Sequence, residues 1–85
     1  MNEIRILGLL IIDRIKEAGR TQHVLSKYGN IIKTRLGSHE LSEDVNSRKG
    51  IVILELVGNA DEFDQLENEL NEIGGIEVKN IKFNY

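Results

Sequence analysis

The chain has 85 residues, no cysteine and no proline, and its net charge is −3. This length predicts a single domain, 1–85, whose small core would gain stability from a partner surface. Without cysteine, neither a disulfide nor a thiolate metal site can stabilise it, and an acidic chain without a basic patch argues against direct binding of nucleic acid.

Residues 4–12 (IRILGLLII) predict a strand, because they are rich in β-branched residues and leucine and end at Asp13-Arg14. Both faces of this strand are apolar, which is typical of a central strand covered on both sides. The run is much shorter than the roughly 20 residues of a membrane span, and neither a positive n-region nor a small-residue cleavage site accompanies it. We therefore expect a cytoplasmic protein with no membrane partner.

From Arg14 to Tyr28 the apolar residues follow a helical period. Asp13 is the expected N-cap and Gly29 the expected stop. The side chains expected to face the core are Ile15, Ala18, Gln22, Leu25 and Tyr28, with Val24 beside them.

Residues 30–38 (NIIKTRLGS) predict a second strand, at an edge of the sheet, with one apolar and one basic face. The polar segment 39–49 predicts a long loop. Residues 50–57 (GIVILELV) predict another central strand, apolar on both faces except at Glu55. A carboxylate in that setting needs a partner, and the expected ones are two cations of the neighbouring strand, Lys33 or Arg35.

Asn59, followed by Glu62 three residues later, is similar to a capping box and predicts the start of a second helix. The apolar stripe of this helix is Phe63, Leu66, Leu70 and Ile73. Gly74-Gly75 ends the helix, and residues 76–83 predict the last strand. The apolar positions of that strand change phase midway, which favours a β-bulge near Lys79-Asn80.

The order βαββαβ predicts an α+β, ferredoxin-like sandwich. Its four-stranded antiparallel sheet has the spatial order 4-1-3-2, with two helices on one face. The other face would then expose leucine, isoleucine and valine, and such a patch usually marks an interface. We expect a homo-oligomer, a dimer or tetramer, formed through that face or by pairing of edge strands. The residues assigned to the interface are Leu7, Leu9, Val52, Leu54, Ile32 and Leu36.

Two stretches resemble a known family. The sequence ADEFDQLENELNEIGGIEVK (Ala60–Lys79) resembles, without a gap, the closing helix and strand of the iron-only hydrogenase system regulators, which are small ACT-like proteins of anaerobic bacteria. The sequence VLSKYGNIIKTRLG (Val24–Gly37) resembles their helix end and second strand. The resemblance implies a stand-alone ACT-like regulatory domain that binds a small-molecule effector or a partner protein and acts in the hydrogenase system.

The chain also departs from that family. The family commonly continues its Arg-x-Gly with a Pro-aromatic-Arg stretch, whereas Gly37 is followed by Ser38-His39-Glu40. The turn before the last strand is Gly74-Gly75 instead of Pro-Gly. Ligand contacts made by the family's loop are therefore not carried over to this chain.

The candidate ligand-binding residues lie at strand ends, and they are Arg35, Gly37, His39, Asp13 and Arg14. ACT domains often place a ligand-binding loop after the first strand, although a helix N-cap and a surface charge are the favoured interpretation of Asp13 and Arg14. Arg35 either pairs across an interface or keeps an edge strand soluble. His39 and the acids that follow it could bind a metal, but their spacing matches no metal motif, so we predict no metal and no cofactor.

Nothing in the sequence predicts an enzyme. No nucleophile has a base with a third orienting group, and no glycine-rich phosphate loop is present. The alternative to a ligand-binding regulator is a protein-interaction or assembly module of the same fold without a small ligand. A pocket at the subunit interface lined by Arg35 and His39 would favour the regulator, and a flat apolar interface would favour the module.

Overall fold

The structure is a computed structural model that describes residues 2–39 and 48–85, so most of the predicted loop at 39–49 lies outside the described residues. Its elements are β1 (Glu3–Ile11), α1 (Arg14–Lys27), a 3-10 turn (Gly29–Ile31), β2 (Ile32–His39), β3 (Gly50–Val57), α2 (Ala60–Asn71) and β4 (Ile76–Asn84).

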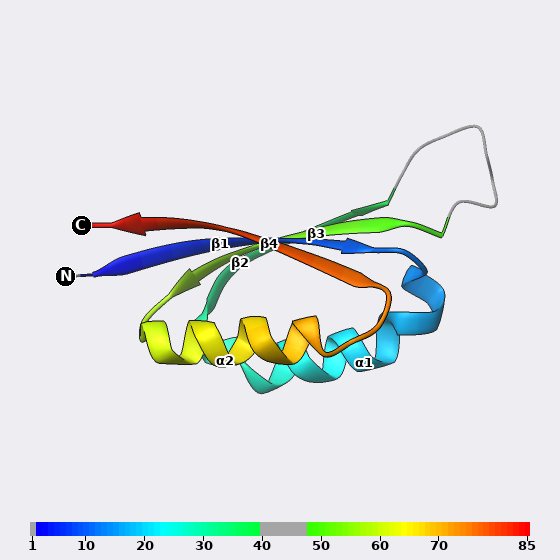
Figure 1. Cartoon of the computed structure of the whole chain (residues 1–85), viewed down its shortest axis with the longest axis horizontal. Helices are drawn as coiled ribbons and strands as arrows, with labels where there is room; N and C mark the ends of the chain where they lie inside the picture. Colours follow the sequence, from blue (N-terminus) through cyan, green and yellow to red (C-terminus); the bar gives the residue numbers. More distant parts are fainter. Residues whose placement is uncertain (1, 40–47) are drawn as a thin grey trace.

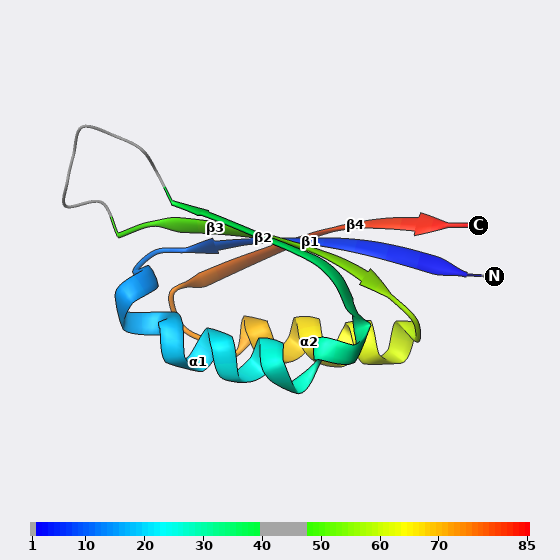
Figure 2. The same ribbon diagram turned by 180° about the vertical axis from the view of Figure 1, so that it is seen from behind.

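The four strands form one antiparallel sheet in the order β2-β3-β1-β4. Both helices cover the same side of this sheet, as the nearly edge-on view in Figure 1 shows. The view from behind agrees (Figure 2). The predicted ferredoxin-like sandwich, with β1 and β3 as its central strands, is therefore confirmed.

Both helices begin at the side-chain caps that the sequence predicted. Asp13 accepts hydrogen bonds from the backbone N–H groups of Ile15 and Lys16, at 3.2 and 3.1 Å. Asn59 accepts one from the N–H of Asp61 at 2.8 Å, and such caps satisfy donors that the helix itself leaves unpaired. In the described ranges, no helix is long and apolar enough to span a membrane.

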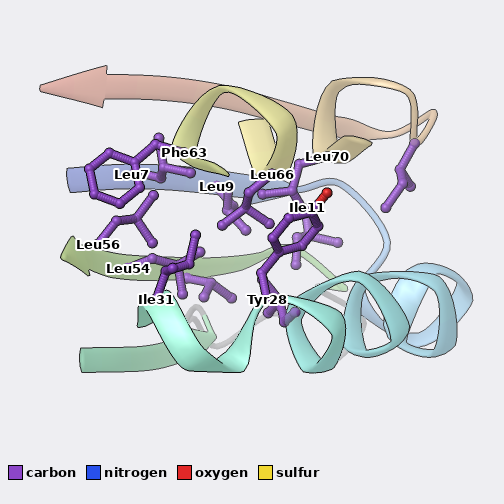
Figure 3. Packing of buried hydrophobic residues seen from close by; sticks show 13 residues of the cluster. Leu7, Leu9, Ile11, Tyr28, Ile31, Leu54, Leu56, Phe63, Leu66 and Leu70 are labelled. Carbon is purple, nitrogen blue, oxygen red and sulfur yellow. The ribbon is translucent and has the colours of Figure 1, made fainter. Parts of the chain in front are cut away.

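The hydrophobic core fills the space between the sheet and the two helices (Figure 3). Side chains of β1 and β3 alternate between the two faces of the sheet, and every second one is buried against the helices. The core residues are Leu7, Leu9, Ile11, Leu25, Tyr28, Ile31, Val52, Leu54, Leu56, Phe63, Leu66, Leu70 and Ile73.

The interface residues predicted on the two central strands are wrong, because they lie on the face that the helices cover. Leu7, Leu9 and Leu54 have no exposed surface and Val52 is 9% exposed, because the helices cover them. Both faces of these strands are apolar, so alternation alone cannot tell which face the helices take. The uncovered side, which we call the open face, carries Ile4, Ile6, Leu10, Ile51, Ile53, Val57, Ile81 and Phe83.

The two interface residues predicted on β2 lie on opposite faces. The register between β2 and β3 shifts between Ile32 and Thr34, so one extra residue reverses the alternation. Ile32 pairs with Leu56 and packs against the core, which makes its assignment to the uncovered face wrong. Leu36 lies opposite Ile53 on the open face and is 62% exposed.

The β-bulge predicted in β4 does not occur. The register between β4 and β1 runs without a shift from Ile76 to Asn84. The apolar residues change face within a regular strand, because Val78 lies on the helix side and Ile81 on the open face. Asn80 takes a helix-side position between them and donates a hydrogen bond to Oε2 of Glu67 at 2.7 Å.

Helix α1 confirms the second half of the predicted stripe, because Leu25 and Tyr28 lie in the core and Val24 packs against it. The first half of the stripe differs from the prediction. Ile15 is 60% exposed, and Ala18 and Gln22 are exposed as well. Counting back four residues at a time from the core residue Leu25 reaches Thr21 and then Glu17. Both polar side chains are buried, and within the described ranges Oε2 of the glutamate and Oγ1 of the threonine have no hydrogen-bond partner.

Arg5 is a charged residue on the helix side of β1, and it is only 2% exposed. Its Nε donates to Glu3 at 2.7 Å, and its Nη1 donates to Asp64 at 2.8 Å and to Glu67 at 3.3 Å. Burial disfavours the charge, but the hydrogen bonds to Glu3 and Asp64 outweigh it and raise the pKa of Arg5. This network ties α2 to β1.

Candidate functional site

A cavity of about 380 Å³ lies between α1 and β2, on the helix side of the sheet. Helix α1 contributes four of the seven lining residues, and β2, β1 and β3 contribute one each. Its polar lining is Arg14, Thr21, Gln22 and Arg35, and its apolar lining is Ile11, Ala18 and Val52. Small-ligand sites commonly have volumes from about 300 to 1,000 Å³ and combine an apolar wall with a few polar groups.

The fold brings together two of the predicted ligand-binding residues. Arg14 opens α1, while Arg35 is paired with Leu54 and so lies on the helix side of β2. Both line the cavity although they are 21 positions apart in the sequence. Guanidinium groups present a fork of donors that matches a carboxylate or a phosphate. The lining therefore favours a negatively charged ligand group.

Asp13 has the structural role that the sequence analysis favoured. It caps α1, and its Oδ2 lies 3.4 Å from Nη1 of Arg48. The hydrogen bond from the backbone of Lys16, helped by the charge of Arg48, lowers the pKa of Asp13. The carboxylate therefore fixes the turn between β1 and α1, which places Arg14 at the cavity.

The other two candidates lie further along β2. Gly37 pairs with Val52, which lines the cavity, but Gly37 itself is not part of the lining. The backbone of His39 pairs with Gly50, and the side chain of His39 falls outside what the structure describes. The seven lining residues of the cavity all come from one copy of the chain.

Sequence reasoning missed Thr21 and Gln22 as site residues. A usable signal was present, because Arg14, Ala18, Thr21 and Gln22 follow the spacing i, i+4, i+7 and i+8 and so share one face of a helix. The sequence analysis turned two of these residues toward the core. An arginine at the start of a polar helical stripe, facing an arginine on an edge strand, would have indicated the cavity.

A second hollow, a groove of about 500 Å³, runs between α1 and α2 and includes His23, Arg20 and Glu69 in its lining. Glu69 accepts hydrogen bonds from Lys27 at 2.8 Å and from the hydroxyl of Tyr28. These bonds lower the pKa of Glu69, chiefly through the lysine, and raise that of both donors. Among the side chains that the structure describes, no group of three histidine or acidic residues could hold a metal ion.

A third hollow, of about 310 Å³, lies on the open face above Gly8. Ile51, Ile53 and Leu10 surround it on the apolar side. Glycine has no side chain to fill this space, and at its point in β1 a Cβ would meet only Cδ1 of Ile53, at 4.0 Å. The open face is therefore indented at its centre.

Glu55 lies on the open face and is paired there, as expected. Its Oε1 accepts a hydrogen bond from the hydroxyl of Thr34 at 2.9 Å, and its Oε2 lies 3.9 Å from Nζ of Lys33. Of the two expected cations, Lys33 is thus the partner, whereas Arg35 lies on the other face. The pairing leaves Glu55 as a structural residue within the open face, between Ile6 of β1 and Thr34 of β2.

No family model matches the chain, and neither does any curated protein. Among solved structures, the uncharacterised protein TM1266 from Thermotoga maritima is 24% identical and has a TM-score of 0.82, with 96% of this chain and 99% of that chain covered.

Two more distant structures are similar over nearly the whole chain. CPII from Thiomonas intermedia K12, solved with ADP, AMP and acetate, is 12% identical, with a TM-score of 0.55 and coverage of 99% and 91%. A dimeric ferredoxin-like protein from an uncultured marine organism is 9% identical, with a TM-score of 0.51 and coverage of 98% and 94%. At these identities the likeness shows the fold, which is ferredoxin-like.

Proposed function

We propose that this chain is a stand-alone regulatory domain that acts as a homo-oligomer and responds to a small ligand. The observation that carries the proposal is the open face. Ile53, Ile81 and Phe83 are 39%, 57% and 54% exposed there, next to the half-buried Ile4 and Ile6 of β1. No described element covers this face (Figure 1), and a contiguous apolar patch of this kind usually marks an interface.

A second copy of the chain is the partner that fits this face best. Apolar residues predominate on the central strands β1 and β3, where Glu55 is paired with Lys33 and Thr34, while the charged Glu77 and Lys79 lie on the edge strand β4. Protein interfaces have the same arrangement of an apolar centre and a polar rim. In a dimer with twofold symmetry the same patch meets itself, so apolar surface meets apolar surface. A ferredoxin-like protein with this fold is described as dimeric, which supports the proposal.

The regulatory part of the proposal depends on the fold and on the cavity. CPII has the same fold and was solved with ADP, AMP and acetate, so this architecture can hold small anionic molecules. The cavity between α1 and β2 offers a site of suitable size in this chain. We further propose that the regulated system is that of the iron-only hydrogenase, on the strength of the resemblance of Ala60–Lys79 to its regulators.

The alternative function is an assembly module that uses the open face and binds no small ligand. The two functions share the oligomer and differ at the cavity. We propose no catalytic role for either.

Two matched variants test the oligomer. Ile81→Lys places a charge among the apolar residues of the open face, on β4 beside Ile6, whereas Ile15→Lys makes the same change at an equally exposed site on the outside of α1. We expect sedimentation velocity to show dissociation of Ile81→Lys into folded monomers, because a lysine would be desolvated at the interface. Ile15→Lys should sediment like the wild type. Equal sedimentation of all three proteins would contradict the proposal.

A further inference from the structure

We propose that the cavity between α1 and β2 binds a small anion that carries a carboxylate or phosphate group and a short apolar body. The inference rests on the proposed function, in that it names the class of effector and the place where it binds.

Charge is the first part of the argument. Arg14 and Arg35 reach the cavity from two different elements, the first turn of α1 and the middle of β2. In the described lining they are accompanied by no carboxylate. Two cations around one concave surface concentrate positive potential inside it, and two guanidinium groups can contact one anion from both sides. The chain as a whole is acidic, so this local reversal of charge favours a specific site over general attraction.

The second part is a pair of polar groups further into α1. Gln22 lines the cavity and carries an amide donor. Thr21 lines it too, is 4% exposed, and has a hydroxyl without a hydrogen-bond partner among the described residues. A buried hydroxyl without a partner is costly, and a bound acceptor would relieve that cost after a small movement of the side chain. The acid of α1 one turn before Thr21 is Glu17, and its side chain lies beside Gly75. A Cβ built on Gly75 would be 3.9 Å from Oε1 of Glu17.

The third part is the apolar wall. Ile11 and Val52 are core residues at the ends of β1 and β3, and Ala18 completes the wall from α1. This surface cannot hold a second charged group, so it suits an alkyl or similar body of a few carbon atoms. A volume of about 380 Å³ leaves room for a small molecule and not for a peptide or an oligonucleotide.

The other two hollows support no comparable ligand. The groove between α1 and α2 includes Glu69 and Glu72, and Glu69 is already held by Lys27 and Tyr28. The hollow above Gly8 belongs to the face assigned to the second copy. Of these three hollows, the cavity between α1 and β2 is the one whose lining leaves chemistry to explain.

The test is a titration of the ¹⁵N-labelled full chain, followed by amide shifts, with inorganic phosphate in one arm and butyrate in the other. Sodium chloride at matched ionic strength corrects for screening. We expect saturable shifts at Ala18, Thr21, Gln22 and Val52 in at least one arm. The arm that saturates identifies the anionic group as phosphate or carboxylate. Shifts that stay linear in both arms, or that lie outside the cavity, would overturn the proposal.

Charge variants give the second readout. Arg14→Gln and Arg35→Gln should each weaken binding by about tenfold or more, because each removes a charge-assisted contact. Arg20→Gln on α1 and Lys33→Gln on β2 remove the same charge from sites outside the cavity and should change the affinity by less than about twofold. All four side chains are exposed, so the fold should survive, which the dispersion of the same spectra checks. Equal losses in all four variants would indicate general attraction and overturn the site.

Light scattering on the same samples separates this inference from the oligomer. An oligomer that binds neither anion overturns the site and leaves the second copy on the open face in place. A monomer that binds an anion with the expected arginine dependence supports the site and overturns the oligomer.

Discussion

Gly8 of β1 lies directly opposite Ile53 of β3 at the centre of the open face, and a Cβ on the glycine would lie 4.0 Å from Cδ1 of that isoleucine. The distance is an ordinary van der Waals contact, so the fold itself does not require glycine here. In the proposed oligomer, the hollow that the glycine leaves would receive a side chain of the second copy.

We therefore predict that Gly8→Val keeps the fold and weakens the oligomer. Valine is favoured in strands, so the free energy of unfolding of the isolated chain should not fall. The filled hollow should weaken self-association by about tenfold or more, since overpacking a close contact is costly. Gly19→Ala on α1, where a Cβ meets nothing within 4 Å, is the control and should leave association unchanged. Sedimentation equilibrium measures both, and unchanged association in Gly8→Val would argue against the hollow as a contact.

Neighbouring residues of β3 should respond in opposite ways to the same substitution. Leu54 is fully buried under the helices, whereas Ile53 faces the open side. Leu54→Lys should unfold the chain, because an unpaired buried charge costs about 4 kcal/mol or more of the 5–15 kcal/mol typical of a domain. Ile53→Lys should stay folded and dissociate. Circular dichroism together with light scattering distinguishes the two, and a folded Leu54→Lys would show that the faces are assigned incorrectly.

The buried hydroxyl of Thr21 gives a prediction about stability. Thr21→Val keeps the shape of the side chain and removes a polar atom that has no partner within the described residues. We expect the free energy of unfolding to rise by about 1 kcal/mol, because threonine and valine have similar helix propensities and the desolvation penalty disappears. Urea denaturation at neutral pH, without added anions, measures it. A loss of stability would mean that the hydroxyl is hydrogen-bonded in solution.

The link between α1 and α2 predicts a pH dependence. Hydrogen bonds from Lys27 and then Tyr28 hold the pKa of Glu69 below its ordinary value of 4.5. A lowered carboxyl pKa contributes stability that is fully present above pH 4.5 and is lost as the pH falls through the lower folded value. Glu69→Gln should therefore be less stable than wild type near about pH 6, and the difference should shrink toward about pH 3.

The two donors, Lys27 and Tyr28, add a loss of stability at high pH. The pKa of Lys27 and that of Tyr28 are raised by Glu69, so their contribution is present below their ordinary values and is lost only as the pH rises through the higher folded ones. Denaturation of wild type and Glu69→Gln from acid pH to above the ordinary pKa values of lysine and tyrosine measures the loss of stability at both ends of the pH range. Glu72→Gln, one turn away and exposed, is the control. A gap between wild type and Glu69→Gln that stays constant down to low pH would rule out this carboxylate as the cause.

Much of the fold followed from local signals in the sequence. Asp13 and Asn59 indicated where the two helices begin, because a capping side chain acts within three residues of its own position. The strand order followed from the element order and from the apolar character of β1 and β3. The irregular register at Lys33 gave no such signal, since a bulge in an edge strand depends on its pairing with β3.

The candidate site was only partly predictable. Arg14 and Arg35 were singled out separately, and their convergence required the packing of α1 on β2. The predicted buried face was wrong for the first half of α1, because the apolar Ile15 and Ala18 suggested it, whereas that part of the helix buries Glu17 and Thr21. The interface prediction was wrong for a related reason, since two equally apolar faces of a strand carry no information about which one the helices cover.

The central claim is that a second copy covers the open face. Light scattering of the wild-type chain at micromolar concentration tests it most directly. We predict a mass of at least twice the 9.6 kDa of one chain. A stable mass of 9.6 kDa would contradict the account, because the apolar side chains of β1, β3 and β4 would then remain in contact with water.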